Sequence, residues 1–252
     1  MPRYKLTVAY EGTDFHGWQK QEPKDKAPLR TVQGVLERVV CEVVREPVIL
    51  TGASRTDSGV HAIGQVAAFT TTREIPTDRL PAAITARCPD DLQVLEAELV
   101  EESFDPISDA VRKQYAYTIQ HGRVTPPLFD RRTIWRTHHD LDSGLMQTGA
   151  QLLEGTHDFE AFANANHGRE STTRHIGSCQ VVETNGNRIR IEVMGNGFLY
   201  NMVRIIAGSL LEIGRGARSP DTVTEAIRDR NRALTGPTLG PEGLCLEWIE
   251  YP

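Results

Sequence analysis

The chain has 252 residues, of which 39% are hydrophobic and 25% are charged. This composition is typical of a globular protein, and the length suits one large domain or two smaller ones. No apolar run approaches the roughly 18 residues that a membrane-spanning helix needs, so we expect no membrane association.

Four widely spaced cysteines form no C-x-x-C pair, which argues against structural zinc and against a disulfide framework. We expect a cytoplasmic protein, because the N-terminus leads into a strand-like pattern without the apolar core of a signal peptide. The formal net charge of −6 does not favour a polyanionic partner, although a basic surface on an acidic body would permit one. Arginines that could form such a surface, or simply be solvated, are Arg131, Arg132 and Arg136, Arg169 and Arg174, Arg215 and Arg218, and Arg228, Arg230 and Arg232.

The first half of the chain alternates strands and helices. Residues 4–10 alternate in polarity like a half-buried strand, and residues 31–45 carry an apolar stripe at helical spacing. Thr31 is a suitable N-cap for that helix, and Pro47 ends the pattern. We predict short buried strands over 48–50 and 65–69, a helix over 77–87 and a strand over 92–100. The resulting order, β-α-β-β-α-β, is that of the ferredoxin-like motif.

The second half has a similar order of elements, without a sequence repeat. We predict strands over 111–120, 133–137, 181–182, 189–193 and 244–249, and helices over 141–154, 198–213 and 221–230. The run Asn185-Gly186-Asn187 is typical of a hairpin turn. The helix over 141–154 is expected to bury Leu145, Met146, Leu152 and Leu153. We place the domain boundary within 101–106, which gives α+β halves of residues 1–104 and 105–252.

The segment from Gly52 to Ala62 contains the run Arg55-Thr56-Asp57-Ser58-Gly59-Val60-His61 and follows a predicted buried strand. Loops held by a rigid strand are favoured places for reacting groups. Arg55 could keep the Asp57 carboxylate charged or bind a phosphate, and His61 could serve as a second acid or base. Gly59 suggests unusual dihedral angles. A polar turn, with Asp57 bonded to its own backbone, explains the same run, so local chemistry leaves both interpretations open.

Six further segments, in the same order along the chain, extend this observation beyond one short motif. They span residues 10–19, 31–37, 113–117, 155–162, 197–204 and 241–244, and Tyr251-Pro252 follows the last of them. Together with residues 52–62, this set resembles the motifs of TruA-type tRNA pseudouridine synthases and covers nearly the whole chain. Two stretches, 238–241 and 137–140, do not match the pattern of the family.

The resemblance implies a fold, an activity and partners. It implies an α+β pseudouridine synthase fold, with two ferredoxin-like halves, a mixed but mostly antiparallel sheet and a central RNA-binding cleft. The implied activity is isomerisation of uridine to pseudouridine at positions 38, 39 and 40 of the tRNA anticodon stem-loop, on a base flipped out of its stack. We therefore expect tRNA and a second copy of the chain as partners, and no metal or small-molecule cofactor.

The same resemblance assigns roles to individual residues. It makes Asp57 the essential carboxylate, Arg204 its counter-charge and Tyr115 an aromatic platform for the uracil. Without it, Tyr115 would be read as a core residue and Arg204 as a residue on a helix surface. Residues expected to contact substrate are Arg55, on the RNA, Leu244, in the uracil pocket or simply in the core, and Lys20, Lys24, Lys26 and Arg30, on phosphates.

Several alternatives stay open. Asp57 could attack C1′, add to C6 of uracil, or remove the C2′ proton and release a glycal. The chain could also be an RNA-binding protein that does not turn over substrate. A third alternative, a hydrolase with an aspartyl nucleophile, usually needs Mg²⁺ and several acidic ligands, whereas no second carboxylate lies near Asp57 in the sequence. His138-His139-Asp140 most resembles a metal-ligand cluster, but adjacent histidines on a strand point to opposite faces.

Overall fold

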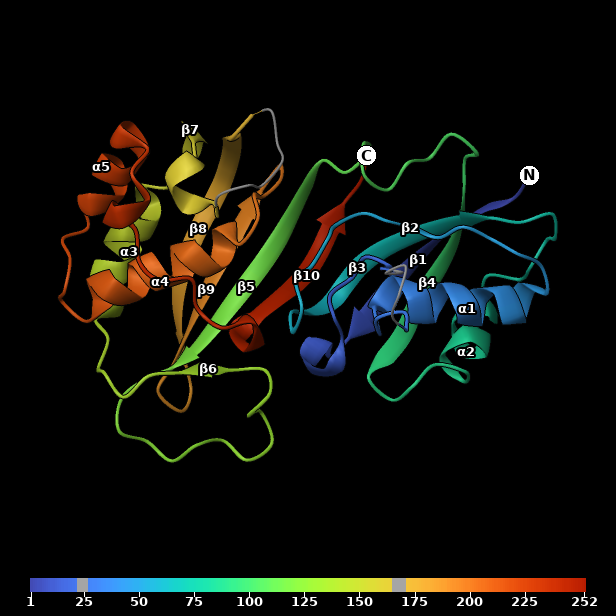
Figure 1. Cartoon of the computed structure of the whole chain (residues 1–252), viewed down its shortest axis with the longest axis horizontal. Helices are drawn as coiled ribbons and strands as arrows, with labels where there is room; N and C mark the ends of the chain where they lie inside the picture. The colour runs from blue at the N-terminus through green and yellow to red at the C-terminus, as the bar shows by residue number, and fades with distance from the viewer. Residues whose placement is uncertain (22–26, 165–170) are drawn as a thin grey trace. The chain divides into compact units, whose positions relative to one another are not determined.

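The computed structural model describes residues 1–21, 27–164 and 171–252 (Figure 1). Lys24, Lys26 and Arg169 lie outside the described residues. The chain divides into two compact units, one of residues 1–111 with 246–252 and one of residues 112–245. The sequence predicts a boundary at 104–105, and the return of the last residues to the first unit was not foreseen. None of the helices in the described ranges has the length and apolar character to cross a bilayer.

The first unit is built on an antiparallel sheet, as the sequence predicts. The strand order is β4-β1-β3, β2 pairs with β3 on a short segment, and β10 neighbours β3. The helices α1 and α2 complete the predicted β-α-β-β-α-β order. The elements are β1 (Arg3–Tyr10), α1 (Val32–Val44), β2 (Thr51–Gly52), β3 (His61–Thr70), α2 (Leu80–Thr85), β4 (Leu92–Val100) and β10 (Leu244–Glu250).

Helix α1 follows the sequence prediction closely. The Thr31 hydroxyl accepts a hydrogen bond from the Gly34 N–H at 3.3 Å, which satisfies one of the free donors of the first turn. The apolar stripe is buried along its length, and Val32, Leu36 and Val40 are fully buried. Because most helix stability in proteins comes from packing an apolar face, this stripe explains why the segment is helical.

The predicted strand over 48–50 is wrong, because the strand starts at Thr51. The backbone of residues 48–50 is satisfied by side chains of α1 instead of a neighbouring strand. The Leu50 N–H donates to Glu37 Oε2 at 3.0 Å, and the Leu50 carbonyl accepts from Gln33 Nε2 at 2.7 Å. The side chain of Ile49 is 83% exposed, so an apolar residue type did not predict burial here.

The strands of the second unit run antiparallel in the order β5-β9-β8-β7, and the short β6 lies parallel to β5. Helix α3 contacts both β8 and α4. The elements are β5 (Arg112–Gln120), β6 (Trp135–Arg136), α3 (Ser143–Gln151), β7 (Gly155–Asp158), β8 (Thr173–Thr184), β9 (Arg188–Gly195), α4 (Met202–Gly214) and α5 (Thr222–Asp229). The fold is therefore a mixed, mostly antiparallel α+β fold, as predicted.

Details of the second unit differ from the prediction. The hairpin turn between β8 and β9 is confirmed, whereas β7 and the first eight residues of β8, 173–180, were not predicted as strand. Helix α3 is shorter than residues 141–154, because the Asp142 side chain caps it by accepting from the Leu145 N–H at 2.9 Å. The predicted burial of Leu145 is wrong, since it is 40% exposed while its neighbour Met146 is fully buried. Adjacent helical residues point about 100° apart, so only one of them faces the core.

Helix α4 is almost entirely buried, and residues 235–239 run against it in close contact. A Cβ atom added at Gly208 would lie 1.9 Å from the carbonyl oxygen of Pro237. The Ser209 hydroxyl accepts a hydrogen bond from the Gly236 N–H at 2.8 Å, which also holds the 235–239 segment against α4. The absence of a side chain at Gly208 thus allows the backbone of the segment to reach the helix.

We expect Gly208→Ala to lower the free energy of unfolding by about 1–3 kcal/mol, because the backbone of Pro237 must move to admit a methyl group. In an exposed helix a Gly→Ala substitution would instead raise the free energy of unfolding. The sign of the change therefore tests whether the backbone of Pro237 lies against Gly208. The measurement is urea unfolding of the purified protein. Gly197→Ala is the control, because its added Cβ would meet only the Arg174 side chain at 3.9 Å. Equal stability of Gly208→Ala and wild type would contradict this packing.

Candidate functional site

Asp57 lies in the loop between β2 and β3, where the chain reverses direction. The Val60 N–H donates to the Asp57 carbonyl at 3.1 Å, and Gly59 has the positive φ of +82° that its place in the sequence suggested. The side chain of Asp57 is partly exposed, and that of Arg55 is exposed. The segment is therefore a polar turn in its geometry, and this turn also presents a carboxylate between two strands.

Two of the sequence motifs, residues 10–19 and 52–62, are bonded to each other. The Tyr10 hydroxyl lies 2.8 Å from the Thr56 hydroxyl, in a buried hydrogen bond. The Trp18 N–H donates to the Thr56 carbonyl at 3.0 Å, and the Ser58 hydroxyl donates to the Phe15 carbonyl at 3.1 Å. The residues on both sides of Asp57 are thus held by residues 10–18. The two motifs together therefore fix the backbone that carries Asp57.

Gln65, on β3, holds the Asp57 loop in place through hydrogen bonds between its side chain and the loop backbone. Its side chain is fully buried; Nε2 donates to the Ser54 carbonyl at 2.6 Å, while Oε1 accepts from the Ser54 N–H at 3.2 Å and the Val66 N–H at 3.1 Å. One amide therefore satisfies both backbone groups of a residue three positions before Asp57. Sequence reasoning treated Gln65 as an ordinary strand residue, although an amide within an otherwise apolar strand was a signal that it has buried polar partners.

His61, which the sequence suggests as a second acid or base, is held by a backbone group of the segment after β1. It is buried at the start of β3, and its Nδ1 accepts a hydrogen bond from the Gly12 N–H at 3.0 Å. Nδ1 is therefore occupied as a hydrogen-bond acceptor, and the bond ties the start of β3 to Gly12.

In the second unit, Tyr115 and Tyr117 lie on the same face of β5. Tyr115 is 6% exposed, pairs with Val193 of β9, and its ring meets the ring of Phe198 edge-on at 5.3 Å. Tyr117 is fully buried, its hydroxyl donates to the Gly240 carbonyl at 2.8 Å, and burial raises its pKa far above the usual value. Tyr117 is therefore a structural residue that fixes the turn before Leu244, and Tyr115 is the more accessible of the two.

Arg204 lies in the first turn of α4 and is partly buried, so it is not a plain helix-surface residue. Its Nε donates to the Leu239 carbonyl and its Nη1 to Asn201 Oδ1, both at 2.7 Å. Asn201 has the left-handed backbone (φ 61°, ψ 8°) that asparagine tolerates better than most residues. Leu244, which is 6% exposed, follows this segment after the 3₁₀ turn Pro241–Gly243.

Two basic residues in the described parts of the first long loop, Lys20 and Arg30, are engaged with acidic partners. Lys20 Nζ lies 3.1 Å from Glu37 Oε1. Arg30 forms a two-bond pair with Asp91, at 2.8 and 2.9 Å, and its guanidinium carbon lies 4.0 Å from the centre of the Phe15 ring. The hydrogen bonds that Arg30 donates to the Asp91 carboxylate raise the pKa of Arg30. A phosphate would have to compete with these carboxylates.

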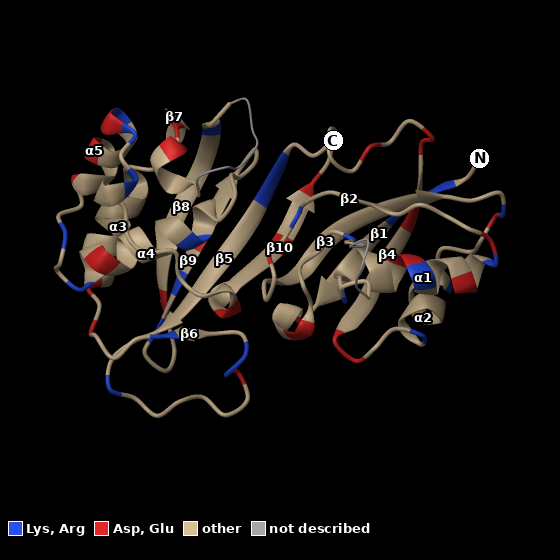
Figure 2. Cartoon of the chain, viewed as in Figure 1, with Lys and Arg blue, Asp and Glu red and all other residues tan. Residues whose placement is uncertain are grey.

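Other arginines also form ion pairs with nearby Asp or Glu residues. Figure 2 shows basic residues in blue and acidic residues in red, interspersed over most elements. These pairs are Arg188–Asp130, Arg190–Glu192, Arg215–Glu212, Arg228–Asp229 and Arg230–Asp158, each with an N···O distance of 2.6–2.9 Å. Surface pairs of this kind stabilise little, but they reduce the positive charge offered to a polyanion.

The part of the chain that the structure describes offers no cluster of metal ligands. It holds no group of three His, Cys, Asp or Glu residues arranged to bind a metal. The expectation that His138 and His139 point to opposite faces is wrong, because they follow the two-residue β6 rather than lying in it, and their ring centres are 4.2 Å apart.

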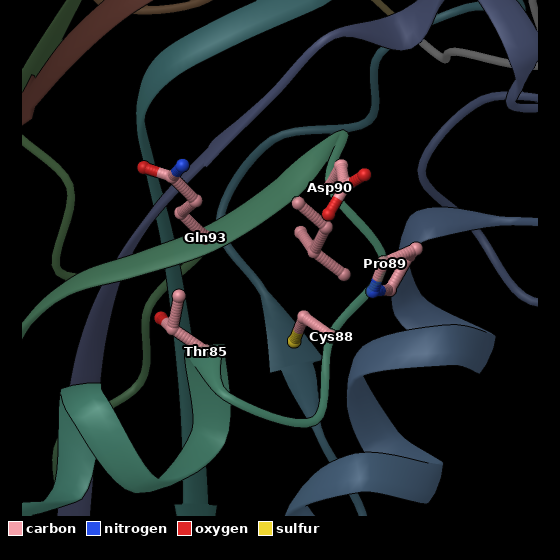
Figure 3. Close-up of a pocket in the computed structure, with 6 residues that line it drawn as sticks. Thr85, Cys88, Pro89, Asp90 and Gln93 are labelled. Atoms are coloured by element: carbon pink, nitrogen blue, oxygen red, sulfur yellow. The ribbon is translucent and has the colours of Figure 1, made fainter.

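A hollow of about 270 Å³ lies beside α2, and its lining includes Cys88 (Figure 3). Burial raises the pKa of the Cys88 thiol to about 11, so this sulfur is not a nucleophile at neutral pH. None of the predicted site residues lines this hollow. The residues that line it are Thr85, Cys88, Pro89, Asp90, Leu92 and Gln93.

Comparison with known proteins identifies the family. A family model described as tRNA pseudouridine synthase matches residues 6–106 and 150–252. The chain belongs to the tRNA pseudouridine synthase family. The tRNA pseudouridine synthase A of Thermoanaerobacter sp. (strain X514) is 41% identical over 251 residues, and tRNA pseudouridine synthase A 2 of Clostridium perfringens is 38% identical over 252 residues. Each comparison covers 100% of both chains, and the protein is accordingly an isomerase.

A solved structure described as an H/ACA RNP bound to a substrate RNA containing 2′-deoxyuridine aligns with 82% of this chain and 44% of that chain. The TM-score is 0.37 and the sequence identity 12%. Membership of the family rests on the full-length sequence relatives and not on this distant likeness.

We expect Gln65→Leu to reduce pseudouridine formation by about tenfold or more, because a loosened Asp57 loop misplaces the carboxylate. The substitution removes the Gln65 partner of two partly buried backbone groups of Ser54, which should also lower the free energy of unfolding by about 1–3 kcal/mol. Turnover and urea unfolding are measured side by side. Gln93→Leu, at an exposed position of β4, is the control. Full activity of Gln65→Leu would show that Gln65 does not position Asp57.

Proposed function

We propose that the enzyme converts uridine to pseudouridine at positions 38, 39 and 40 of the tRNA anticodon stem-loop, with Asp57 as the essential carboxylate. The observation that carries the proposal is the pair of bonded motifs around Asp57, in a chain that matches tRNA pseudouridine synthases over its whole length. A partly exposed carboxylate on a loop with buried anchors is suited to a reaction that needs accurate placement.

The chemistry explains why a carboxylate is needed. The N1–C1′ bond of uridine breaks, the uracil turns, a C5–C1′ bond forms, and the hydrogen on C5 leaves as a proton while N1 gains one. An ionised Asp57 can assist by attacking C1′, by adding to C6, or by removing the C2′ proton. No electrons are gained or lost, so none of these routes calls for a redox cofactor.

Other residues take supporting roles in the proposal. Arg204 supplies positive charge that favours ionised Asp57, Tyr115 stacks on or donates to the uracil, and Leu244 forms an apolar wall of the uracil pocket. Two hydrogen bonds of the Arg204 guanidinium go to uncharged oxygens, those of Leu239 and Asn201, and they help to fix its orientation. Arg55, Lys20 and Lys24 contact the RNA.

Recognition of the tRNA depends on shape and backbone more than on base sequence, because three different positions are served. The target uridine is flipped out of its stack to meet Asp57. We also propose that the enzyme works as a homodimer, as the family resemblance implies.

We expect Asp57→Asn to abolish pseudouridine formation while tRNA affinity changes less than about threefold, because the substitution removes the charge and keeps the shape. Release of tritium from tRNA labelled at uridine C5 measures the reaction, and filter binding measures affinity. Asp78→Asn, at a side chain that is 77% exposed, is the control for loss of one acidic charge. Activity of Asp57→Asn near that of wild type would remove Asp57 from the reaction.

The positions are tested by mapping pseudouridine in tRNA from a strain that lacks the gene, before and after treatment with the purified enzyme. The proposal requires new pseudouridine at positions 38–40 and at no other position. A wild-type protein that binds tRNA but forms no pseudouridine on any tRNA would support the alternative of an RNA-binding protein without turnover.

A metal-dependent hydrolase with an aspartyl nucleophile is the second alternative, and chelation distinguishes it. We expect full pseudouridine synthase activity in excess EDTA, provided that the tRNA is folded beforehand and monovalent salt maintains its structure. Loss of activity in EDTA that returns with Mg²⁺, on a tRNA shown to remain folded, would contradict the proposed chemistry.

A further inference from the structure

The loop between β5 and β6, residues 121–134, exposes two large apolar side chains. Phe129 is 94% exposed and Leu128 is 67% exposed, at adjacent positions that follow Pro126-Pro127. We call Leu128 and Phe129 the loop tip. Scattered single apolar residues are ordinary on protein surfaces, but an almost fully exposed aromatic beside a second large apolar residue is a feature of interaction sites.

The base of this loop is tied to its surroundings in the second unit. The Gly122 N–H donates to the His139 carbonyl at 2.9 Å. Arg136 Nη2 donates to the Val124 carbonyl at 3.3 Å, and its Nε donates to Gln120 Oε1 at 3.1 Å. The two ends of the loop are therefore bonded to each other rather than spread apart.

The residues that follow the loop tip are also bonded to their surroundings. Asp130 accepts an ion-pair contact from Arg188 of β9 at 2.7 Å, and its carbonyl accepts from the Thr133 N–H at 3.0 Å. Phe129 precedes this anchor directly, so its backbone is held while its ring projects into solvent. The exposure of the ring is thus a consequence of an ordered loop.

The charge around the loop tip is positive. Residues 121–136 contain four arginines and one carboxylate, Asp130, whose charge is offset by its pairing with Arg188 from outside the segment. Arg123, Arg131 and Arg132 are exposed. Figure 2 shows Lys/Arg positions on the loop that connects β5 to β6, in a protein whose total charge is −6. An exposed aromatic flanked by guanidinium groups is the combination that binds unpaired bases and their phosphates.

We propose that the 121–134 loop is a contact site for tRNA outside the catalytic residues, in which Phe129 stacks on an unpaired base and Arg123, Arg131 and Arg132 bind the adjoining phosphates. The inference rests on the proposed function, because tRNA is the substrate there. The loop lies between the two stretches, 6–106 and 150–252, that the family model matches. It therefore adds a recognition element to those that the family resemblance implies.

A second copy of the chain is the alternative partner, and the charges argue against it. A two-fold symmetric contact through the loop tip would bring the same three exposed arginines of both copies near the axis. Arginines brought together near the axis would repel each other, and the core of a protein interface is usually depleted in charged residues. An RNA backbone instead carries negative charge along its length, which the exposed arginines of the loop can bind.

The test compares Phe129→Ala, Phe129→Trp and the double variant Arg131→Gln with Arg132→Gln, using an unmodified tRNA transcript with uridines at positions 38–40. Phe129→Ala should weaken tRNA binding by about tenfold, within the range measured for loss of one stacked base, while Phe129→Trp should bind at least as well as wild type. The double arginine variant should bind more weakly at low salt and show a smaller dependence of affinity on salt concentration. The rate at saturating tRNA should stay unchanged in all three.

Matched controls are Ile49→Ala, at an apolar side chain that is 83% exposed in the other unit, and Arg79→Gln, at a side chain that is 86% exposed. Phe129→Ala that binds tRNA as tightly as wild type would overturn the inference. So would a Phe129→Ala protein that changes oligomeric state in sedimentation without RNA, because the loop would then be a self-association contact. A wild type that binds tRNA but makes no pseudouridine would instead overturn the proposed function and leave the affinities interpretable.

Discussion

The pairing of buried backbone groups around Asp57 is the constraint on which the candidate site depends. A buried N–H or carbonyl without a partner costs more than a typical hydrogen bond contributes, so the loop adopts the path on which Gln65 satisfies Ser54 and Trp18 satisfies Thr56. These anchors lie one to three residues before Asp57. They therefore restrict the positions that the Asp57 carboxylate can take. The side chain of Asp57 itself stays partly exposed.

Arg204 is held by the same principle with different partners. Its guanidinium is oriented by the carbonyl of Leu239 and the amide of Asn201, and the same segment continues through the turn fixed by Tyr117 to Leu244. Substitutions in the 235–243 segment would therefore disturb Arg204 and Leu244 together, although neither residue is adjacent to the other in sequence. The close approach of this segment to α4, through Gly208 and Ser209, gives it a rigid support.

The electrostatics of the protein are local rather than global. Many of its arginines and two basic residues of its first long loop are paired with carboxylates, which is consistent with a net charge of −6. Attraction of a polyanion must then come from places where positive charge is concentrated, and the loop between β5 and β6 has more arginines than carboxylates. A basic substrate-binding surface on an acidic enzyme needs only such concentrated positive charge.

The sequence alone determined the elements whose causes are local. The apolar stripe and Thr31 cap gave α1, the alternation of residues 92–100 gave β4, and the run at 185–187 gave the hairpin turn, since periodicity and turn chemistry act over a few residues. The ordered motifs also selected Asp57, Tyr115 and Arg204 as candidates. Tertiary structure decided what depends on distant partners. It decided that residues 48–50 bond to α1 side chains instead of forming a strand, that Leu145 is exposed beside buried Met146, and that Gln65 braces the Asp57 loop. A pattern along the chain shows which groups need a partner, but only the folded chain determines which partner each of them has.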